Sequence, residues 1–185
     1  MSQQKLKNLK NRKNAKNKQS GFGMTEMLIV VGIVMVVIIF LLGKATNATD
    51  KVNSGKVVDA VNSIQIGVNQ MFSTSGGDYS TLTDSDILYL VPKSMINGTG
   101  SSRKVVTPWY GDNGTEIKVA PTNANKQFTV TLNDLPPAAC REIGANYLNG
   151  VADSVTAAGS AVVDTSNLNS KCDSSSKATL VLTFH

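Results

Sequence analysis

The hydrophobic residues of this chain of 185 residues are concentrated in one block near its beginning. Residues 27–42, MLIVVGIVMVVIIFLL, include no charged residue, and extension to Met24 and Gly43 gives 20 residues. As a helix this block is about 30 Å long, which is sufficient to cross a membrane. An uncleaved membrane anchor and a secretory signal peptide cut near Ala45 have the same hydropathy. Other residues must therefore distinguish these alternatives.

The pattern after this block predicts that the helix continues. No proline precedes Pro92, so a helix that begins near Phe22 can extend to about Phe72 or Ser75. Apolar residues recur at alternating spacings of four and three, as expected for one buried stripe. The stripe consists of Val57, Val61, Ile64, Val68 and Met71, with Phe72 beside it. Ala45, Ala48 and Val52 lie on a different side of the helix, which predicts contacts between subunits.

Strand patterns dominate the remaining sequence. Residues 104–110 and 115–120 flank GDNG, which predicts a hairpin turn, and strands are also expected at 127–132 and 178–184. A short helical stretch is expected near Asp84 to Tyr89. Residues 136–150, PPAACREIGANYLNG, predict a helix that begins with proline and ends near glycine. The polar stretch from Ala152 to Ser176 has no clear pattern. The chain is therefore predicted to be α+β with an antiparallel sheet.

The basic residues are unevenly distributed. Seven of the eighteen precede Gly21, where no acidic residue occurs, whereas from Phe22 onward eleven basic residues face thirteen acidic ones, a net charge of −2. A lysine-rich arm can bind nucleic acid, but a basic flank beside an apolar span is the signal that keeps this end cytoplasmic. No nucleic-acid partner is expected. The part after the span is predicted to be extracytoplasmic.

Cys140 and Cys172 are the two cysteines, and both belong to the part predicted to be exported. An even number of cysteines in an oxidising compartment favours a disulfide, with two buried free thiols as the alternative. On the chain-entropy account, closing a loop of this length stabilises the fold by about 3 to 4 kcal/mol.

Glu26 is the residue that distinguishes the alternatives for the apolar block. A carboxylate at the edge of an apolar helix costs several kcal/mol unless it is paired, and neither an anchor nor an ordinary signal peptide needs it. Residues 19–34, QSGFGMTEMLIVVGIV, resemble the class III signal of type IV prepilins. The matching features are a basic leader, Gly21, a hydrophobic first mature residue Phe22, and a glutamate at the fifth mature position.

The resemblance implies that a prepilin peptidase cuts between Gly21 and Phe22 and methylates the new amino terminus of Phe22. A cut after Gly23 is the alternative, but it would leave Glu26 at the third position. The apolar segment is retained after this cleavage. The ammonium at Phe22 and the carboxylate of Glu26 are each costly in an apolar bundle, whereas together they neutralise one another. A pair of this kind between neighbouring subunits would set their register.

The chain is most similar to the type IVb subclass of pilins, such as toxin-coregulated pilins and the thin-pilus PilS pilins. The long leader, NSIQIGVNQ followed by GGDY, and CREI at Cys140 carry this similarity. It implies a long N-terminal helix packed on an antiparallel sheet and a C-terminal disulfide-bounded region. The expected parts are a removed leader (1–21), a membrane and filament-core helix (22–44), an amphipathic half (45–75) and a globular head (76–185), with the disulfide-bounded region at 140–172.

No catalytic pattern is recognised, so the chain is not expected to be an enzyme. The one histidine is the last residue, His185, and no zinc-binding or phosphate-binding motif occurs. No cofactor or metal is expected. The oxygen-rich run from Asp112 to Glu116 is compatible with calcium, but a hairpin turn is the better interpretation. Trp109 and Tyr110 are left without a role.

The sequence therefore predicts the major structural subunit of a type IVb pilus, a homo-oligomeric surface filament for adhesion, aggregation or conjugative contact. Expected partners are the prepilin peptidase and the assembly machinery of the inner membrane. The precursor is expected in the bacterial inner membrane and the product in an extracellular pilus. Alternatives are a minor pilin, a type II secretion pseudopilin, or a binding domain tethered to a membrane.

Overall fold

The computed structural model describes residues 23–109 and 115–185, and the side chains of residues 41–48 are not described. The chain divides into two compact units, Met1–Lys44 and Ala45–His185, and each is described by itself. The predicted leader, the cleavage-site residues Gly21 and Phe22, and the predicted GDNG turn lie outside the described residues.

The long helix expected from the sequence is confirmed as α2, Met24–Phe72. A short 3-10 helix, η2 (Ser73–Ser75), follows it. Gly76 and Gly77 then adopt positive φ angles of 66° and 71°. The Gly77 amide donates to the Phe72 carbonyl at 3.1 Å. Glycine adopts this left-handed conformation without the steric cost of a Cβ atom, so the GG pair ends the helix.

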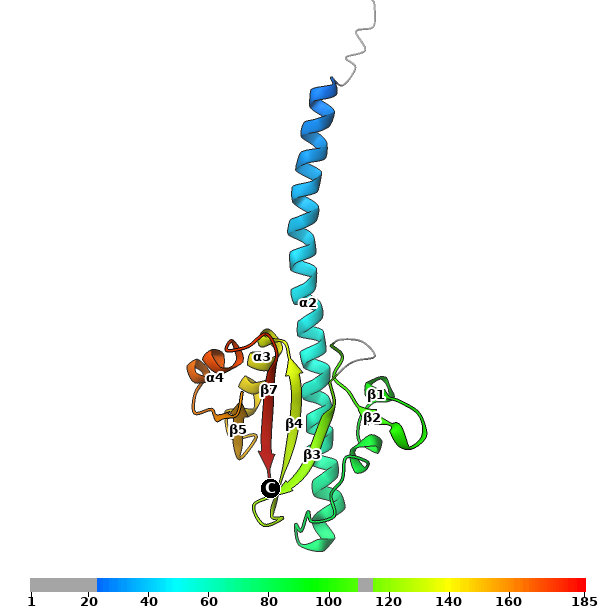
Figure 1. Ribbon diagram of the computed structural model, residues 1–185, viewed down its shortest axis with the longest axis vertical. Helices are drawn as coiled ribbons and strands as arrows, with labels where there is room; N and C mark the ends of the chain where they lie inside the picture. Colours follow the sequence, from blue (N-terminus) through cyan, green and yellow to red (C-terminus); the bar gives the residue numbers. More distant parts are fainter. Residues whose placement is uncertain (1–22, 110–114) are drawn as a thin grey trace, which may run out of the picture. The chain divides into compact units, whose positions relative to one another are not determined.

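The second unit contains a five-stranded antiparallel sheet (Figure 1). Its strands are β3 (Ile117–Thr122), β4 (Gln127–Leu135), β7 (Ala178–Phe184), β5 (Ser154–Ala157) and β6 (Ser160–Ala161), in that spatial order. The C-terminal strand β7 is central because β4 and β5 pair with its two edges. The strands predicted at 127–132 and 178–184 are confirmed, although β4 continues three residues further.

The two central strands alternate buried and less buried side chains, as a half-buried sheet requires. Facing positions in the antiparallel register bury matching apolar pairs, such as Val130 opposite Leu182 and Phe128 opposite Phe184. Register is strongly specified here, because a slip of one residue would turn every one of these side chains toward solvent.

Residues 49–72 of α2 pack against the buried face of the sheet and complete the hydrophobic core. Figure 1 shows them alongside β3 and β4. Val57, Val61, Ile64 and Val68 are all 0% exposed, so this part of the predicted stripe is confirmed. Ala60 is also fully buried, and its small side chain allows close approach. Met71 was wrongly included, since it is 44% exposed. Phe72 fills the end of the core instead, with its ring 5.4 Å from Tyr79.

An unbroken series of aromatic contacts crosses the core of the second unit. The Tyr79 ring lies 5.0 Å from Phe128, the Phe128 ring 5.6 Å from Phe184, and the Phe184 ring 5.9 Å from Tyr147. These tilted and edge-on geometries are the favourable ones for aromatic pairs. The series joins the loop after α2, both central strands and the helix α3 (Pro137–Tyr147).

The predicted hairpin between residues 104–110 and 115–120 is confirmed only in part, since Val106 bridges Glu116 and the Thr107 amide donates to the Thr115 carbonyl at 2.9 Å. The strand β2 (Lys104–Val105) pairs with β1 (Ile96–Asn97), and one bridge, Val106 to Glu116, connects it toward β3. Pro108 has no amide hydrogen to continue a ladder. Before β1 lie the short 3-10 helices η3 (Asp86–Tyr89) and η4 (Lys93–Met95), and η5 (Gly100–Ser102) lies between the two strands. The helical stretch expected near Asp84 to Tyr89 corresponds to η3.

The helix predicted from residues 136–150 is confirmed as α3, Pro137–Tyr147. The stretch from Ala152 to Ser176, which had no clear pattern, is instead ordered as β5, β6 and a second helix, α4 (Thr165–Cys172). The carboxylate of Asp164 accepts a hydrogen bond from the Asn167 amide at 2.7 Å and caps α4. An aspartate directly before a helix is a common cap, so Asp164 is a sequence signal from which α4 could have been predicted.

Tyr147 connects α3 to α2. The residue is 1% exposed, and its hydroxyl donates toward the Asn62 side-chain oxygen at 2.9 Å and the Val58 carbonyl at 3.2 Å. Burial raises the pKa of the Tyr147 hydroxyl, and the nearby Asp59 carboxylate raises it further. The neutral hydroxyl is therefore the form that holds these two helices together.

Two glycines of α2 allow a test of how the loop after the helix packs on it. A methyl group added at Gly67 would overlap the side chain of Leu90, whereas one added at Gly55 would meet nothing within 4 Å. Both Gly→Ala changes gain the same helix propensity, about 1 kcal/mol. We expect Gly67→Ala to be less stable than Gly55→Ala by about 1 to 3 kcal/mol, the usual cost of overpacking. Urea unfolding of the full chain in non-ionic detergent measures this difference, and equal stabilities would contradict the close packing.

Tyr147→Phe should lower the free energy of unfolding by about 1 to 2 kcal/mol, because one buried hydrogen bond is lost. Because the folded-state pKa is raised, the contribution of Tyr147 is complete below about pH 10 and is lost as pH rises further. Stability of the unmodified chain should therefore fall more steeply above pH 10 than that of the variant. Tyr89→Phe is the control, since Tyr89 is 82% exposed. Indistinguishable pH profiles for Tyr147→Phe and the unmodified chain would disprove this role.

Candidate assembly segment

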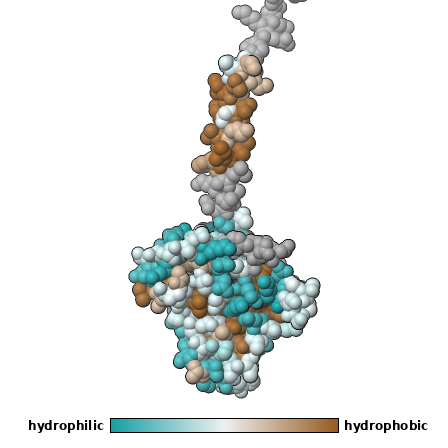
Figure 2. Space-filling model, viewed as in Figure 1, coloured by the Kyte–Doolittle hydropathy of each residue, from teal (hydrophilic) through white to brown (hydrophobic). Residues whose placement is uncertain are grey.

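The described residues of the first unit form an apolar helical segment. Every large hydrophobic side chain from Met24 to Phe40 is at least 45% exposed, and these side chains occupy all sides of the helix. Figure 2 shows this stretch as a mainly hydrophobic surface. We call residues 24–40 the apolar segment. An apolar surface of this extent is characteristic of a site that binds other protein or lipid.

Glu26 is the one ionisable residue of the apolar segment. Its carboxylate accepts a hydrogen bond from the Gly23 amide at 3.2 Å, while its own amide donates to the Gly23 carbonyl at 2.9 Å. This reciprocal arrangement resembles a capping box, in which a glutamate three residues into the helix binds the amide that precedes it. The negative charge also lies at the favourable, N-terminal end of the helix dipole. The roles predicted for Glu26 did not include this cap, although the spacing of Gly23 and Glu26 indicates it.

None of the helices within the described residues combines the length and apolar character needed to cross a membrane. The side chains of residues 41–44 lie outside the description. The membrane role of residues 22–44 stays a prediction.

The second unit contains the predicted disulfide. Cys140 in α3 is bonded to Cys172 at the end of α4, with their Cα atoms 5.7 Å apart, and both residues are fully buried. The alternative of two free thiols is wrong. An ion pair between the Arg141 guanidinium and the Asp173 carboxylate, 2.5 Å apart, lies beside the bond on the surface. The contact between α3 and α4 is therefore held by a covalent bond inside and by charges outside.

Trp109 has a structural position in the second unit. It is 6% exposed, and its indole Nε1 donates to the Asp50 carboxylate at 3.2 Å. This bond attaches the end of the segment after β2 to α2. Tyr110 and Asp112 lie outside the described residues. Among the described residues, no group of three or more histidine, cysteine or acidic side chains could hold a metal ion.

His185 is the C-terminal residue, and its ring Nδ1 lies 2.5 Å from the Asp153 carboxylate. Its carbonyl accepts a hydrogen bond from the Asn69 side chain at 3.1 Å, and the other end of that amide accepts from the Tyr79 hydroxyl at 2.9 Å. These bonds attach the end of the chain to α2 and to Asp153, the residue before β5. They connect the last residue of the chain to the folded unit.

Comparisons with known proteins agree with this architecture. The chain is 29% identical over 127 residues to the toxin coregulated pilin of Vibrio cholerae serotype O1 El Tor, which covers 68% of this chain and 56% of the relative. A second Vibrio cholerae toxin coregulated pilin is 29% identical over 128 residues, with the same coverage. The chain thus spans little more than half the length of these relatives.

A solved structure shows the same fold. The crystal structure of a type IVb pilin from Salmonella typhi has a TM-score of 0.50 and 23% identity, and covers 69% of this chain and 97% of that chain. The family described as PilS N terminal matches residues 51–185. These residues include the buried part of α2, the sheet and the disulfide, and the chain therefore belongs to the PilS N-terminal family, with the fold of a type IVb pilin.

Proposed function

We propose that this chain is the major structural subunit of a type IVb pilus, assembled through its N-terminal helix into a surface filament. The observation that carries this proposal is the exposed apolar segment, residues 24–40, in a chain whose second unit has the pilin fold. Burial of apolar surface stabilises by about 25 cal/mol per Å². A bundle of many such helices removes this surface from water on every side, which a single neighbouring protein cannot do.

Processing is the next part of the proposal. The basic leader of residues 1–21 keeps the N terminus in the cytoplasm while the precursor is held in the inner membrane. A prepilin peptidase cuts between Gly21 and Phe22 and methylates the Phe22 amine, and the assembly machinery of the inner membrane then adds the subunit to the filament. The resemblance of residues 19–34 to the prepilin signal supports this order.

Glu26 is proposed to set the register of each new subunit. In the described structure its carboxylate binds only the Gly23 amide of its own helix, a cap of about 1 kcal/mol. An unpaired carboxylate inside an apolar bundle would cost several kcal/mol. The ammonium of Phe22 on a neighbouring subunit can neutralise it at the one stagger that brings the two groups together. The filament then serves adhesion, aggregation or conjugative contact.

Replacement of Gly21 tests processing. Gly21→Asp should leave an uncut precursor and no filaments, because a charged side chain replaces the glycine that precedes the cut. The intact mass of the unmodified product should correspond to residues 22–185 with one added methyl group. Ser20→Ala is the matched leader control and should be processed normally. Abundant filaments formed by an uncut Gly21→Asp chain would refute the proposal, and an unmodified product that starts at Met1 would favour a tethered domain.

Replacement of Glu26 by glutamine separates its two roles. Glutamine can accept the same hydrogen bond from the Gly23 amide, so the cap is retained, but its neutral side chain cannot pair with an ammonium. We expect Glu26→Gln to be cut normally and to lower the yield of sheared surface filaments by about tenfold or more, since a lost pair of this kind is worth several kcal/mol.

The yield of this protein in sheared surface filaments tests both the role of Glu26 and the proposal that the chain is the major subunit. Normal yield from Glu26→Gln would mean that Glu26 acts as a helix cap alone. The unmodified chain should dominate the sheared filament fraction. Its near absence from that fraction, with normal processing, would assign the chain as a pseudopilin or a minor pilin.

A further inference from the structure

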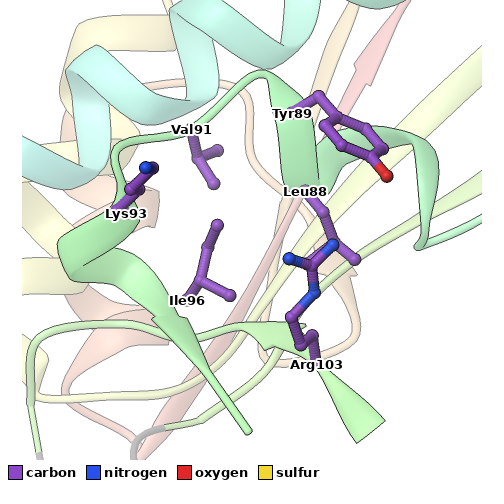
Figure 3. Close-up of a pocket in the computed structure, with 6 residues that line it drawn as sticks. All are labelled: Leu88, Tyr89, Val91, Lys93, Ile96 and Arg103. Atoms are coloured by element: carbon purple, nitrogen blue, oxygen red, sulfur yellow. The ribbon is translucent and has the colours of Figure 1, made fainter. Parts of the chain in front are cut away.

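A cavity of about 500 Å³ lies in the second unit, in the segment between α2 and the sheet. Its walls come from η3, η4, β1 and the residue before β2. The residues that line it are Leu88, Tyr89, Val91, Lys93, Ile96 and Arg103 (Figure 3). Ligand pockets in proteins are commonly about 300 to 1,000 Å³, so this cavity can hold a small organic molecule.

The lining combines an apolar surface with an exposed aromatic ring. Val91 is 8% exposed, and Leu88 and Ile96 are half-buried against the core. Tyr89 is 82% exposed, although a tyrosine side chain carries a large apolar ring. Its ring is therefore available at the edge of the cavity, as Figure 3 shows.

The two charged side chains of the lining are both cations. Within the described residues, neither Lys93 nor Arg103 has an ion pair, and no acidic residue lines the cavity. Figure 3 shows the Arg103 guanidinium directed between Ile96 and Leu88, into the space that the apolar side chains enclose. The cavity therefore offers positive charge beside a low-dielectric surface, where an anion is attracted more strongly than in open water.

The positive charge of the cavity contrasts with the charge of the rest of the second unit. Residues 45–185 contain ten basic and twelve acidic residues, a net charge of −2. Residues 87–111 nevertheless contain three basic residues and no acidic one. These three are Lys93, Arg103 and Lys104. Because the unit as a whole is negative, any attraction of anions must come from the basic residues near the cavity and not from the net charge.

The loop that presents Arg103 has a defined conformation. Gly98 has φ 93°, and a methyl group added there would overlap the carbonyl oxygen of Ser102. The Ser102 amide donates to the Thr99 carbonyl at 3.1 Å, and Ile96 pairs with Val105 across the two strands. This turn holds the backbone of Arg103 close to Gly98 in one conformation before any ligand binds, which lowers the entropy cost of binding.

We propose that this cavity binds a small organic anion that has a carboxylate on an apolar or aromatic body. The carboxylate fits the planar fork of Arg103, with Lys93 adding positive charge. The body lies on Val91, Leu88 and Ile96 and against the Tyr89 ring. An inorganic anion would leave the apolar wall without contact, and a neutral molecule would leave two cations unpaired.

Fluorine NMR of the full chain in non-ionic micelles tests this site. The probe is 4-(trifluoromethyl)phenylacetate, and its neutral amide has the same body without the charge. We expect the chain to broaden the line of the acid and not that of the amide. Lys93→Gln combined with Arg103→Gln should weaken binding of the acid by about tenfold or more, since charge-assisted hydrogen bonds are lost.

Two further variants separate the pocket from general charge. Lys51→Gln with Lys56→Gln removes the same charge from exposed positions of α2 and should bind the acid normally. Gly98→Ala retains both cations but disturbs the turn, and should weaken binding. Each chain is checked for folding by circular dichroism. Equal broadening of acid and amide, equal losses in the two double variants, or no broadening beyond that of empty micelles would overturn the proposal.

Discussion

Burial of one face of α2 against the sheet is the interaction on which the second unit depends. Val57, Val61, Ile64 and Val68 have no exposed surface, and burial of such side chains stabilises by about 1.5 to 3 kcal/mol each. The central strands β4 and β7 meet this face with their own alternating apolar residues. The other face of these two strands is less buried, and β5 and β6 extend the sheet beyond β7.

The disulfide-bounded region, residues 140–172, supplies the edge of the sheet formed by β5 and β6. The bond between Cys140 and Cys172 joins α3 to α4, while Tyr147 joins α3 to α2 through Asn62 and Val58. The strands β5 and β6 extend the sheet from β7. A polar stretch with little apolar surface of its own is thus ordered by a covalent bond, a helix cap and strand pairing, because its intrinsic pattern is too weak to order it.

Residues 24–40 differ from residues 49–72 although both belong to α2. The second stretch has one buried face and one polar face, whereas the first is apolar on every side and exposed. One exposed carboxylate, Glu26, interrupts this apolar surface and occupies the favourable end of the helix. The two stretches therefore have different roles. Residues 49–72 complete the core of the second unit, whereas residues 24–40 expose an apolar surface that other protein or lipid can cover.

Local patterns in the sequence determined several features without help from the fold. The unbroken apolar block, the absence of proline before Pro92 and the spacing of four and three determined a long helix with a buried stripe, because helix geometry alone decides which residues share a face. Alternation with a period of two determined β4 and β7. The prepilin-like run around Gly21, Phe22 and Glu26 is also purely local, because it consists of one short contiguous segment.

The tertiary structure alone decided what depends on residues distant in sequence. It paired β2 with β1 and left a single bridge, Val106 to Glu116, on the side of β3. It left Met71 exposed and gave its place to Phe72, whose ring meets Tyr79. It also brought Lys93 and Arg103 to one cavity. Strand partners, the end of a buried stripe and a cluster of charges each depend on which segments meet in space, and no local pattern contains that information.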